Sequence, residues 1–532
     1  MRRRKQNPCA GARTQFIRVQ ARPTLLRLAL TITWEPQMNA GILRFRLIVI
    51  IGAMISWASS PARAEPFKAR DPGVQLVSSR GSAPSSCPDS TMQPFDPAPL
   101  PGLTPEQLKF FCAGLQEFRK ADAVKDGLGP TMNLDSCVGC HAYPAAGGTS
   151  PPKSIGNPQI AFLRNYKPGT NTAPTFITSD GPVREVRFIH DKYGKPDGGV
   201  HSLFTITGLP DSGACKISQP DFANEFKGIN KPGNNAIFRI PTPLFGAGLM
   251  EQIEDSTLTA NQSAKSRYKY DKIGFLPKGH LNVVRSGHTK GSENHNGNDG
   301  TIARFGWKAQ NKSLLVFGGE AYNVEMGISN ELFETERNED KECQFHTVPN
   351  DTSSPDKLAA AKVDDRYDAY SDIDKFAAFM RFSAPPAPST DAPGGVESIG
   401  RGSSDFMKIG CSQCHTPELM TSSNSTVAAL SGQPVRLFSD LALHDMGIRL
   451  ADGVSQGQAG PQEFRSAPLW GLGQRSFFLH DGRTSDLDEA IRFHASPGKL
   501  GKGGSEANPV VHEYRELTEK EKQDLLNFLR SL

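Results

Sequence analysis

Two short segments carry the same five-residue pattern of thiols and an imidazole. They are Cys137-Val-Gly-Cys140-His141 and Cys411-Ser-Gln-Cys414-His415. The CxxCH pattern is typical of c-type haem attachment, in which both thiols add to vinyl groups and the adjacent histidine becomes the proximal iron ligand. Two intervening residues let one helical turn present both sulfurs to one porphyrin edge. The sequence therefore predicts two covalently bound haems c, with His141 and His415 as metal ligands.

Zinc binding and thiol redox chemistry are the alternatives for these cysteine pairs. Two CxxC pairs could form a Cys₄ zinc site. However, 270 residues separate Cys140 from Cys411, and each pair carries the same histidine. A thioredoxin-like motif would need a βαβ setting that the flanking sequence lacks. Haem attachment is the better interpretation of both motifs.

The N-terminal region has the order of a secretory signal. Arg44 and Arg46 precede the apolar run Leu47–Trp57, and the small-residue segment Ala62-Arg63-Ala64 follows. We expect cleavage before Glu65, and Met38 just upstream would make an ordinary start. Eleven apolar residues fall short of the roughly 20 needed to span a membrane. The sequence predicts an exported bacterial protein of the periplasm, with no membrane contact after signal cleavage.

Four further cysteines follow the leader, namely Cys87, Cys112, Cys215 and Cys343. An even number in an exported chain predicts two disulfides, and three pairings are open.

Charge and composition exclude several classes of function. Residues 1–64 hold eleven Lys or Arg residues and one acid, so 49 basic and 55 acidic residues remain for the rest of the chain. A body with a net negative charge offers no general attraction to phosphate backbones, which argues against nucleic-acid partners. A mean hydropathy of −0.43 also argues against an integral membrane protein.

The elements that must position the two motifs predict a mainly α fold. Residues 1–64 form the leader and signal peptide, and 65–101 a Pro/Ser-rich arm. We expect a haem domain over 102–390, with a large insertion of loops and β-hairpins at about 150–300, and a second cytochrome c-like haem domain over 391–532. Short alternating runs such as Val183–Ile189 and Leu203–Ile206 predict the hairpins.

Helix-start signals mark both ends of this arrangement. Thr104 and Gln107 form a potential capping box ahead of an apolar stripe that leads to the first motif. Thr518 and Glu521 form another before the C-terminal stripe. A helix at about Asp372–Arg381 precedes the Pro-rich linker 383–395.

Several segments resemble known diheme proteins. Ala467-Pro-Leu-Trp-Gly-Leu-Gly ahead of Phe478-Leu-His-Asp-Gly-Arg483 is similar to the bacterial diheme cytochrome c peroxidase superfamily. Arg304-Phe-Gly-Trp-Lys-Ala309 and Ser439-Asp-Leu-Ala-Leu-His-Asp-Met-Gly447 resemble more closely its di-haem oxidoreductase family, sometimes labelled thiol oxidoreductase. The likeness covers roughly residues 104–532 and is weakest across 150–235.

The distal ligand of the second haem is a candidate on a short helix. Leu487, Ala490, Ile491 and His494 share one helical stripe that His494 ends. The resemblance places an axial Met of the peroxidases on the matching helix, so His494 is the first candidate, with Met446 next and His444 third. A core histidine bonded to a carbonyl is the alternative. His480 and Asp481 belong to a turn shared across the superfamily and are interpreted as structural, with Arg483 as a candidate partner for a haem propionate.

The N-terminal haem is predicted to be open and reactive. The peroxidases carry a Gly-His-Gly-Trp stretch whose His can cap the iron, and here Phe305 stands before Gly306-Trp307. Val324-Glu325-Met326 resembles the stretch that supplies their catalytic glutamate, so Glu325 and Trp307 are the candidate catalytic residues. The interval between these two residues is shorter than in the peroxidases, and a Phe-Trp-Asp-Gly-Arg segment is missing. The other potential caps are His280, His288, His295 and His346.

A polar loop, Asn294–Gly300, is dense in oxygen donors and is a candidate Ca²⁺ site, although it lacks the EF-hand spacing.

Two function classes follow from the haems. One is a peroxidase-like enzyme that takes electrons from a small donor protein of cytochrome c or cupredoxin type and acts on peroxide, or on an organic or protein substrate. The alternative is a non-enzymatic electron-transfer cytochrome with both haems capped.

Overall fold

The computed structural model describes residues 67–75, 87, 96–165, 173–174, 176–190, 193–195, 200–201, 209, 215, 221–226, 233–265, 277, 279–284, 301–336, 341–344, 349–360 and 366–532. The segment Pro66–Leu532 forms one compact unit. The predicted leader and signal peptide lie outside the described residues, as do the loop 294–300 and three of the potential haem caps, His288, His295 and His346.

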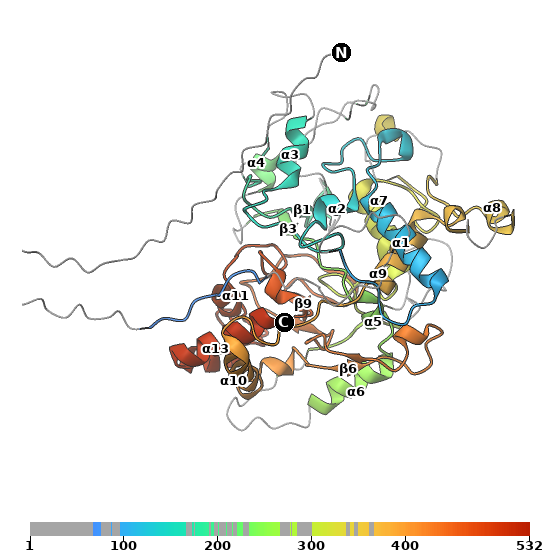
Figure 1. The fold of residues 1–532 in the computed structure, drawn as a ribbon. Coiled ribbons are helices and arrows are strands. Elements are labelled where there is room, and N and C mark those ends of the chain that lie inside the picture. The colour runs from blue at the N-terminus through green and yellow to red at the C-terminus, as the bar shows by residue number, and fades with distance from the viewer. Residues whose placement is uncertain are drawn as a thin grey trace, which may run out of the picture. The chain divides into compact units, whose positions relative to one another are not determined.

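The described chain is mainly helical, with short strands between the helices (Figure 1). The α-helices are α1 (Pro105–Arg119), α2 (Cys137–Cys140), α3 (Pro158–Asn165), α4 (Phe222–Glu225), α5 (Ala247–Glu251), α6 (Asp255–Lys265), α7 (Leu314–Met326), α8 (Pro355–Ala360), α9 (Asp372–Phe382), α10 (Gly395–Lys408), α11 (Leu487–Phe493), α12 (Asn508–Glu516) and α13 (Glu519–Ser531). The predicted helix at Asp372–Arg381 is therefore confirmed as α9.

The strands form small sheets, as the prediction of short hairpins requires. They are β1 (Glu185–Phe188), β2 (Val200–His201), β3 (Ala236–Arg239), β4 (Asn282–Val284), β5 (Thr301–Ala303), β6 (Leu419–Met420), β7 (Pro434–Val435), β8 (Leu443–Asp445), β9 (Glu463–Arg465), β10 (Lys499–Leu500) and β11 (Gly503–Gly504). β1 lies between β2 and β3 in an antiparallel sheet, and it falls within the predicted run Val183–Ile189. The run Leu203–Ile206 lies outside the described residues.

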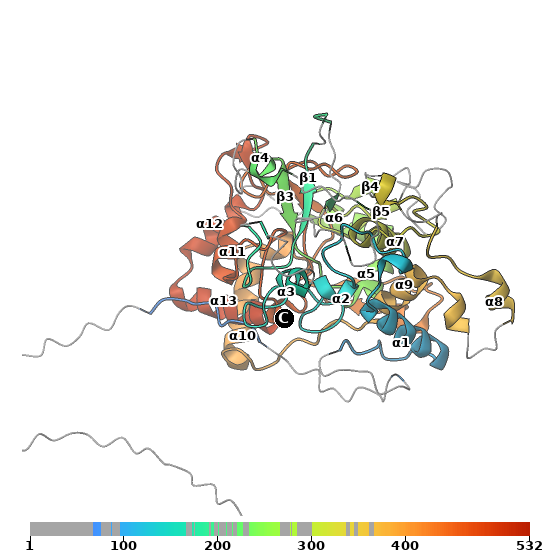
Figure 2. The same cartoon turned by 90° about the horizontal axis from the view of Figure 1, so that it is seen from above.

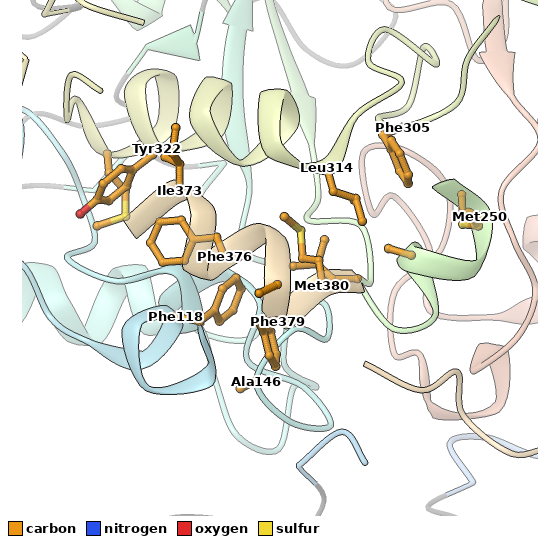
Figure 3. Packing of buried hydrophobic residues seen from close by; sticks show 14 of the residues in the cluster. Phe118, Ala146, Met250, Phe305, Leu314, Tyr322, Ile373, Phe376, Phe379 and Met380 are labelled. Atoms are coloured by element: carbon orange, nitrogen blue, oxygen red, sulfur yellow. The ribbon is translucent and has the colours of Figure 1, made fainter. Parts of the chain in front are cut away.

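Helix α1 leads toward the first CxxCH motif and packs against α9. The predicted capping box of Thr104 and Gln107 starts α1. Phe118 of α1 and Phe379 of α9 meet with ring centroids 5.0 Å apart, in the apolar cluster that Figure 3 shows. A Cβ on Gly114 would lie 2.2 Å from the carbonyl oxygen of Lys375, so only glycine allows this contact between the two backbones.

Helices α10 and α13 repeat this arrangement around the second motif. Helix α10 ends at Lys408, shortly before Cys411, and the second predicted capping box starts α13. A Cβ on Gly402 would lie 2.0 Å from the carbonyl oxygen of Asp524, and Phe406 meets Phe528 at 5.5 Å. In α1 and in α10 alike, an aromatic residue follows the contact glycine by four positions. Figure 2 shows the α1–α9 and α10–α13 pairs as separate packing units.

Two disulfides confirm the cysteine prediction and define the pairing that the sequence left open. Cys87 pairs with Cys112, and Cys215 pairs with Cys343, while the four CxxCH cysteines carry free thiols. None of the helices in the described part of the chain is long and apolar enough to cross a membrane.

Candidate functional site

The first CxxCH motif lines a large cavity. Cys137 and Cys140 occupy the single turn α2, and His141 follows at its C-terminal end. All three line this cavity, whose volume is about 180 Å³. The Nδ1 atom of His141 lies 3.0 Å from the carbonyl oxygen of Gly148, which leaves Nε2 for a metal. Burial lowers the pKa of His141 to about 4, so the imidazole is neutral, as metal ligation requires.

The second motif has the same local geometry in a second cavity. Cys411, Cys414 and His415 line a largely apolar cavity of about 220 Å³. The Nδ1 atom of His415 lies 2.9 Å from the carbonyl oxygen of Phe438, whose backbone adopts a left-handed conformation with φ of 51°. Burial, and then the nearby His494, lower the pKa of His415 to about 4. Again the Nε2 atom of a neutral imidazole remains for a metal.

The three candidate distal ligands of the second cavity differ in what their side chains already bind. His494 ends α11, and its Nδ1 atom lies 2.8 Å from the carbonyl oxygen of Ala490, so its Nε2 atom is left for a ligand. In His444, Nε2 lies 3.0 Å from Asp440 and Nδ1 lies 2.9 Å from Glu506. With both ring nitrogens engaged by carboxylates, His444 is a poor ligand. Met446 also lines the cavity.

Glu325 belongs to the first cavity. It lies on α7, and its side chain is exposed to the cavity interior. Glu185 of β1 lines the same cavity. Burial first, and then the Glu185 charge, raise the pKa of Glu325 to about 8, while Arg187 opposes this shift. A carboxyl group that can hold a proton near neutral pH therefore faces the first CxxCH motif.

Trp307 lies between the two motifs. Its indole lines both cavities, together with Ile240 and Pro241, and its Nε1 atom donates to the carbonyl oxygen of Ile240 at 2.9 Å. Phe305 packs on Phe317 at 6.2 Å and is not among the residues that line the first cavity. The Arg304–Ala309 segment thus brings a single aromatic side chain to the boundary of the two cavities.

Each cavity is also lined by a buried arginine that has one N–H group without an acceptor in the part of the chain that the structure describes. Such a group shows whether the cavity suits an anionic ligand such as haem. Among the described residues, the buried Nε atoms of Arg239 at the first cavity and of Arg475 at the second have no hydrogen-bond partner. Burial lowers the pKa of Arg475 to about 10. Arg239 is already paired with Asp452 through Nη2, at 2.7 Å, but the Nε–H group of each arginine is buried without an acceptor in the described ranges. A haem carboxylate could accept a hydrogen bond from such a group. Free thiols, available imidazole nitrogens and these cations together fit haem c in both cavities.

Other residues singled out in the sequence lie elsewhere. Arg483 is held by Asp481, with Nη2 and Oδ2 2.7 Å apart, and lines neither cavity. His480 lines the second cavity and stacks on Phe464 at 4.4 Å. His280 lies 2.9 Å from Glu463 and lines neither cavity. Within the described ranges, no group of three or more His, Cys, Asp or Glu side chains could hold a metal ion, and the predicted Ca²⁺ loop falls outside them.

Sequence reasoning missed Glu185, Arg187, Gln310 and the two arginines just described. The only signal for the first two was the alternation Glu185-Val-Arg187-Phe, which puts both charges on one face of a strand. Gln310 lines the first cavity with its Oε1 atom buried and without a partner among the described residues, and the sequence carried no signal for it.

Comparison with known proteins defines the class. The family described as "Di-haem oxidoreductase, putative peroxidase" matches residues 232–532, more than half of the chain. The chain therefore belongs to this di-haem oxidoreductase family, and membership implies two haems, with which the cysteine pairs at 137/140 and 411/414 are consistent. The match begins after the first CxxCH motif. No curated protein matches.

Two solved structures give further likenesses. A MauG-like protein associated with microbial copper homeostasis shares 19% identity over 54% of this chain and 89% of its own, with a TM-score of 0.25. A Kuenenia stuttgartiensis hydrazine synthase, pressurised with xenon, shares 18% identity over 30% of this chain, with a TM-score of 0.21. This chain spans 55% of that synthase chain.

Proposed function

We propose that the protein is an exported diheme c-type oxidoreductase of peroxidase type, with the N-terminal haem as its reactive centre. The observation that carries the proposal is the position of Glu325. Its protonatable carboxyl group faces the same cavity as Cys137, Cys140 and His141. Reduction of peroxide needs a group that takes a proton from the near oxygen and returns one to the leaving oxygen. Glu325 can do both.

The roles of the other residues follow from what they contact. When bound, the haems would supply iron that exchanges electrons with substrate and donor. Cys137 and Cys140 would hold the first haem covalently, with His141 beneath it, and Cys411, Cys414 and His415 would hold the second in the same way. Trp307 lines both cavities and would supply an aromatic connection between the two binding sites.

The C-terminal haem is proposed as the electron relay. His415 and His494 both line the second cavity with an Nε2 atom left for a ligand, so an iron bound by both would have two imidazole ligands. A haem with two strong protein ligands shuttles electrons rather than binding substrate. The donor would be a small cytochrome c or cupredoxin in the periplasm, and the oxidant peroxide.

The paired helices support two cytochrome c-like units as the scaffold. In each, the helix ahead of a CxxCH motif crosses a later helix at a glycine followed by an aromatic contact. The first unit would be completed by the insertion, whose strand β1 contributes to the cavity wall. Two similar units fit the expected boundary near residue 390.

A second candidate function is electron transfer without catalysis. Three methionines, Met132, Met326 and Met380, also line the first cavity. A thioether bound to the N-terminal iron would close it, because Met is an axial ligand of cytochromes c. The protein would then be a carrier with both haems capped.

Electron paramagnetic resonance and one variant separate the two functions. The oxidised enzyme should show a high-spin signal that cyanide converts to low spin, and Glu325→Gln should lower the rate of peroxide turnover by about 10²–10⁴-fold. Glu516→Gln, at the exposed end of α12, is the matched control and should leave the rate unchanged. Two low-spin haems that bind neither cyanide nor CO would establish the carrier. Full turnover in Glu325→Gln would remove the acid–base role.

A further inference from the structure

The first described segment of the N-terminal arm, residues 67–75, lies against the C-terminal part of the chain. We call this segment the strap. Figure 1 shows it as a blue trace that runs beside α11, although 416 residues separate Asp71 from Leu487 in the sequence. The backbone N–H group of Ala69 donates to Oε2 of Glu519 at 2.9 Å, and its methyl group packs against the apolar cluster to which Leu487 belongs. The strap is therefore bound to two helices, α11 and α13.

Asp71 makes the most specific contact of the strap. Its two carboxylate oxygens accept from Nε and Nη2 of Arg530, each at 2.7 Å, and the two side chains are 8% and 1% exposed. The backbone N–H group of Leu487, the first residue of α11, donates to Oδ2 at 2.8 Å. Within the strap, the N–H group of Gly73 donates to Oδ1 at 2.9 Å and fixes the orientation of the carboxylate. One carboxylate thus joins the strap, α11 and α13.

Both partners of Asp71 lead to the second cavity. Helix α11 has about two turns, and His494 follows its last residue directly, so Asp71 and the candidate distal imidazole lie at opposite ends of one short helix. On the α13 side, Nη1 of Arg530 donates to the carbonyl oxygen of Arg475 at 2.8 Å, and Arg475 itself lines the cavity. The strap therefore contacts two of the elements that form the cavity wall.

The energetics make this contact hard to replace. Among the described residues, Asp71 is the one carboxylate within ion-pair distance of Arg530. A buried cation that loses its partner is strongly unfavourable, so the surroundings of Arg530 must rearrange if the carboxylate is removed. The first N–H groups of a helix have no acceptor within it, and Asp71 supplies a charged acceptor to that of Leu487.

We propose that Asp71 is a positioning residue of the second haem, which holds α11 so that His494 stays bound to the iron. This inference rests on the proposed function, in which His494 is the distal ligand of the electron relay. Asp71 acts through α11 and does not touch the haem. While it binds Leu487 and Arg530, the start of α11 is fixed. Without it, the imidazole is still present but leaves the iron more often.

The alternative is that the strap only stabilises the folded chain. A second contact keeps α11 in place when Asp71 is changed, because Asp488 of α11 accepts from the hydroxyl group of Tyr514 on α12. We therefore expect the helix to remain folded and its first turn to loosen. Both interpretations lower the free energy of unfolding. Only the positioning role changes how fast His494 leaves the iron in the folded protein.

Carbon monoxide binding to the reduced, haem-loaded protein measures this step. A haem with an open side binds CO rapidly, whereas a haem with two protein ligands binds it only after one has left. The unmodified protein should show a slow phase, and His494→Gly should make that phase fast. Asp71→Ala should accelerate the slow phase about tenfold or more, as the loss of one charged hydrogen bond predicts. Asp71→Asn keeps a neutral acceptor for Leu487 and should give an intermediate rate.

Two controls separate position from stability. Arg70→Gln changes an exposed neighbour of Asp71 within the strap and should leave the slow phase unchanged. Arg381→Gln breaks the ion pair between Arg381 of α9 and Glu251 of α5, neither of which lines the second cavity. It should lower the free energy of unfolding and leave the slow phase unchanged.

The outcomes distinguish this inference from the function on which it rests. If His494→Gly removes the slow phase but Asp71→Ala leaves its rate unchanged, the positioning role is overturned and the distal ligand stands. If Asp71→Ala does not retain both haems, an unchanged rate in Asp71→Asn overturns it instead. Equal acceleration in Arg381→Gln also overturns it, in favour of general stability. A slow phase that persists in His494→Gly contradicts the proposed relay ligand, whatever the Asp71 variants show.

Discussion

We propose that a single imidazole at the end of α11, that of His494, is the distal ligand of the second haem. The Nδ1 atom of His494 already forms a hydrogen bond with the carbonyl oxygen of Ala490, so the ring is oriented before a metal binds. The competing His444 has both nitrogens held by carboxylates. A ligand that is oriented in advance loses little conformational entropy on binding iron.

We therefore predict that His494→Gly converts the C-terminal haem from low spin to high spin. The measurement is electron paramagnetic resonance of the oxidised protein, with imidazole added to restore the missing ligand. Met446→Leu is the matched control within the same cavity and should leave the low-spin signal intact. If the glycine variant keeps its signal and Met446→Leu loses it, Met446 is the ligand.

At the residue scale, the sequence was most informative where covalent chemistry constrains spacing. The two CxxCH motifs could be recognised because thioether attachment requires those residues next to one another. Glu325 was found only through resemblance, and Glu185 was not found at all. The position of both carboxyl groups at one cavity depends on how β1 and α7 come together, which local spacing does not encode.

Among the helices and strands, the most specific feature is the close crossing of two helices at a glycine. Gly402 on α10 lets the backbone of α13 approach so closely that even a methyl group would overlap the carbonyl of Asp524. The same helix carries Gly400, which has no atom within 4 Å of a Cβ built there. Substitutions at Gly402 and Gly400 can therefore be compared within one helix, the first as the test and the second as its control.

Gly402→Ala should lower the free energy of unfolding by about 1–3 kcal/mol, because the added methyl group must push the two helices apart. Gly400→Ala should raise it by about 0.5–1 kcal/mol, because alanine is the better helix former at an open position. Chemical denaturation followed by circular dichroism measures both changes. Equal effects of the two substitutions would show that the crossing tolerates a side chain.

Elements were predictable where their signals are local. The capping boxes at Thr104 and Thr518 mark helix starts because their hydrogen bonds close within one turn. The strand at Glu185–Phe188 was expected from alternation. Its position in the wall of the first cavity was not, because the sequence predicted an insertion of loops and hairpins within the haem domain without placing its strands relative to the haem.

At the scale of the whole molecule, the two haem sites are separate in chemistry but adjacent in space. Each cavity has its own cysteine pair, proximal histidine and buried arginine, and the cavities share Ile240, Pro241 and Trp307. Polar and charged groups cluster at the first cavity, whereas the second is largely apolar. This asymmetry fits a reactive centre that handles protons beside a relay that handles only electrons.

Separate attachment leads to a prediction for the intact chain. The purified protein, denatured in alkaline pyridine, should contain two haems per chain that acidified solvent cannot extract, because each is held by two thioether bonds. Replacing Cys411 and Cys414 by Ala should reduce the ratio to one and remove the low-spin signal of the relay. Replacing Cys137 and Cys140 by Ala should also leave one haem, but with the high-spin, cyanide-binding component lost. A ratio of one in the unmodified protein, or haem that extracts freely, would show that the two cavities do not both bind haem c. Loss of both haems on changing either motif would show instead that the sites depend on each other for assembly, against the independence that their separate ligand sets predict.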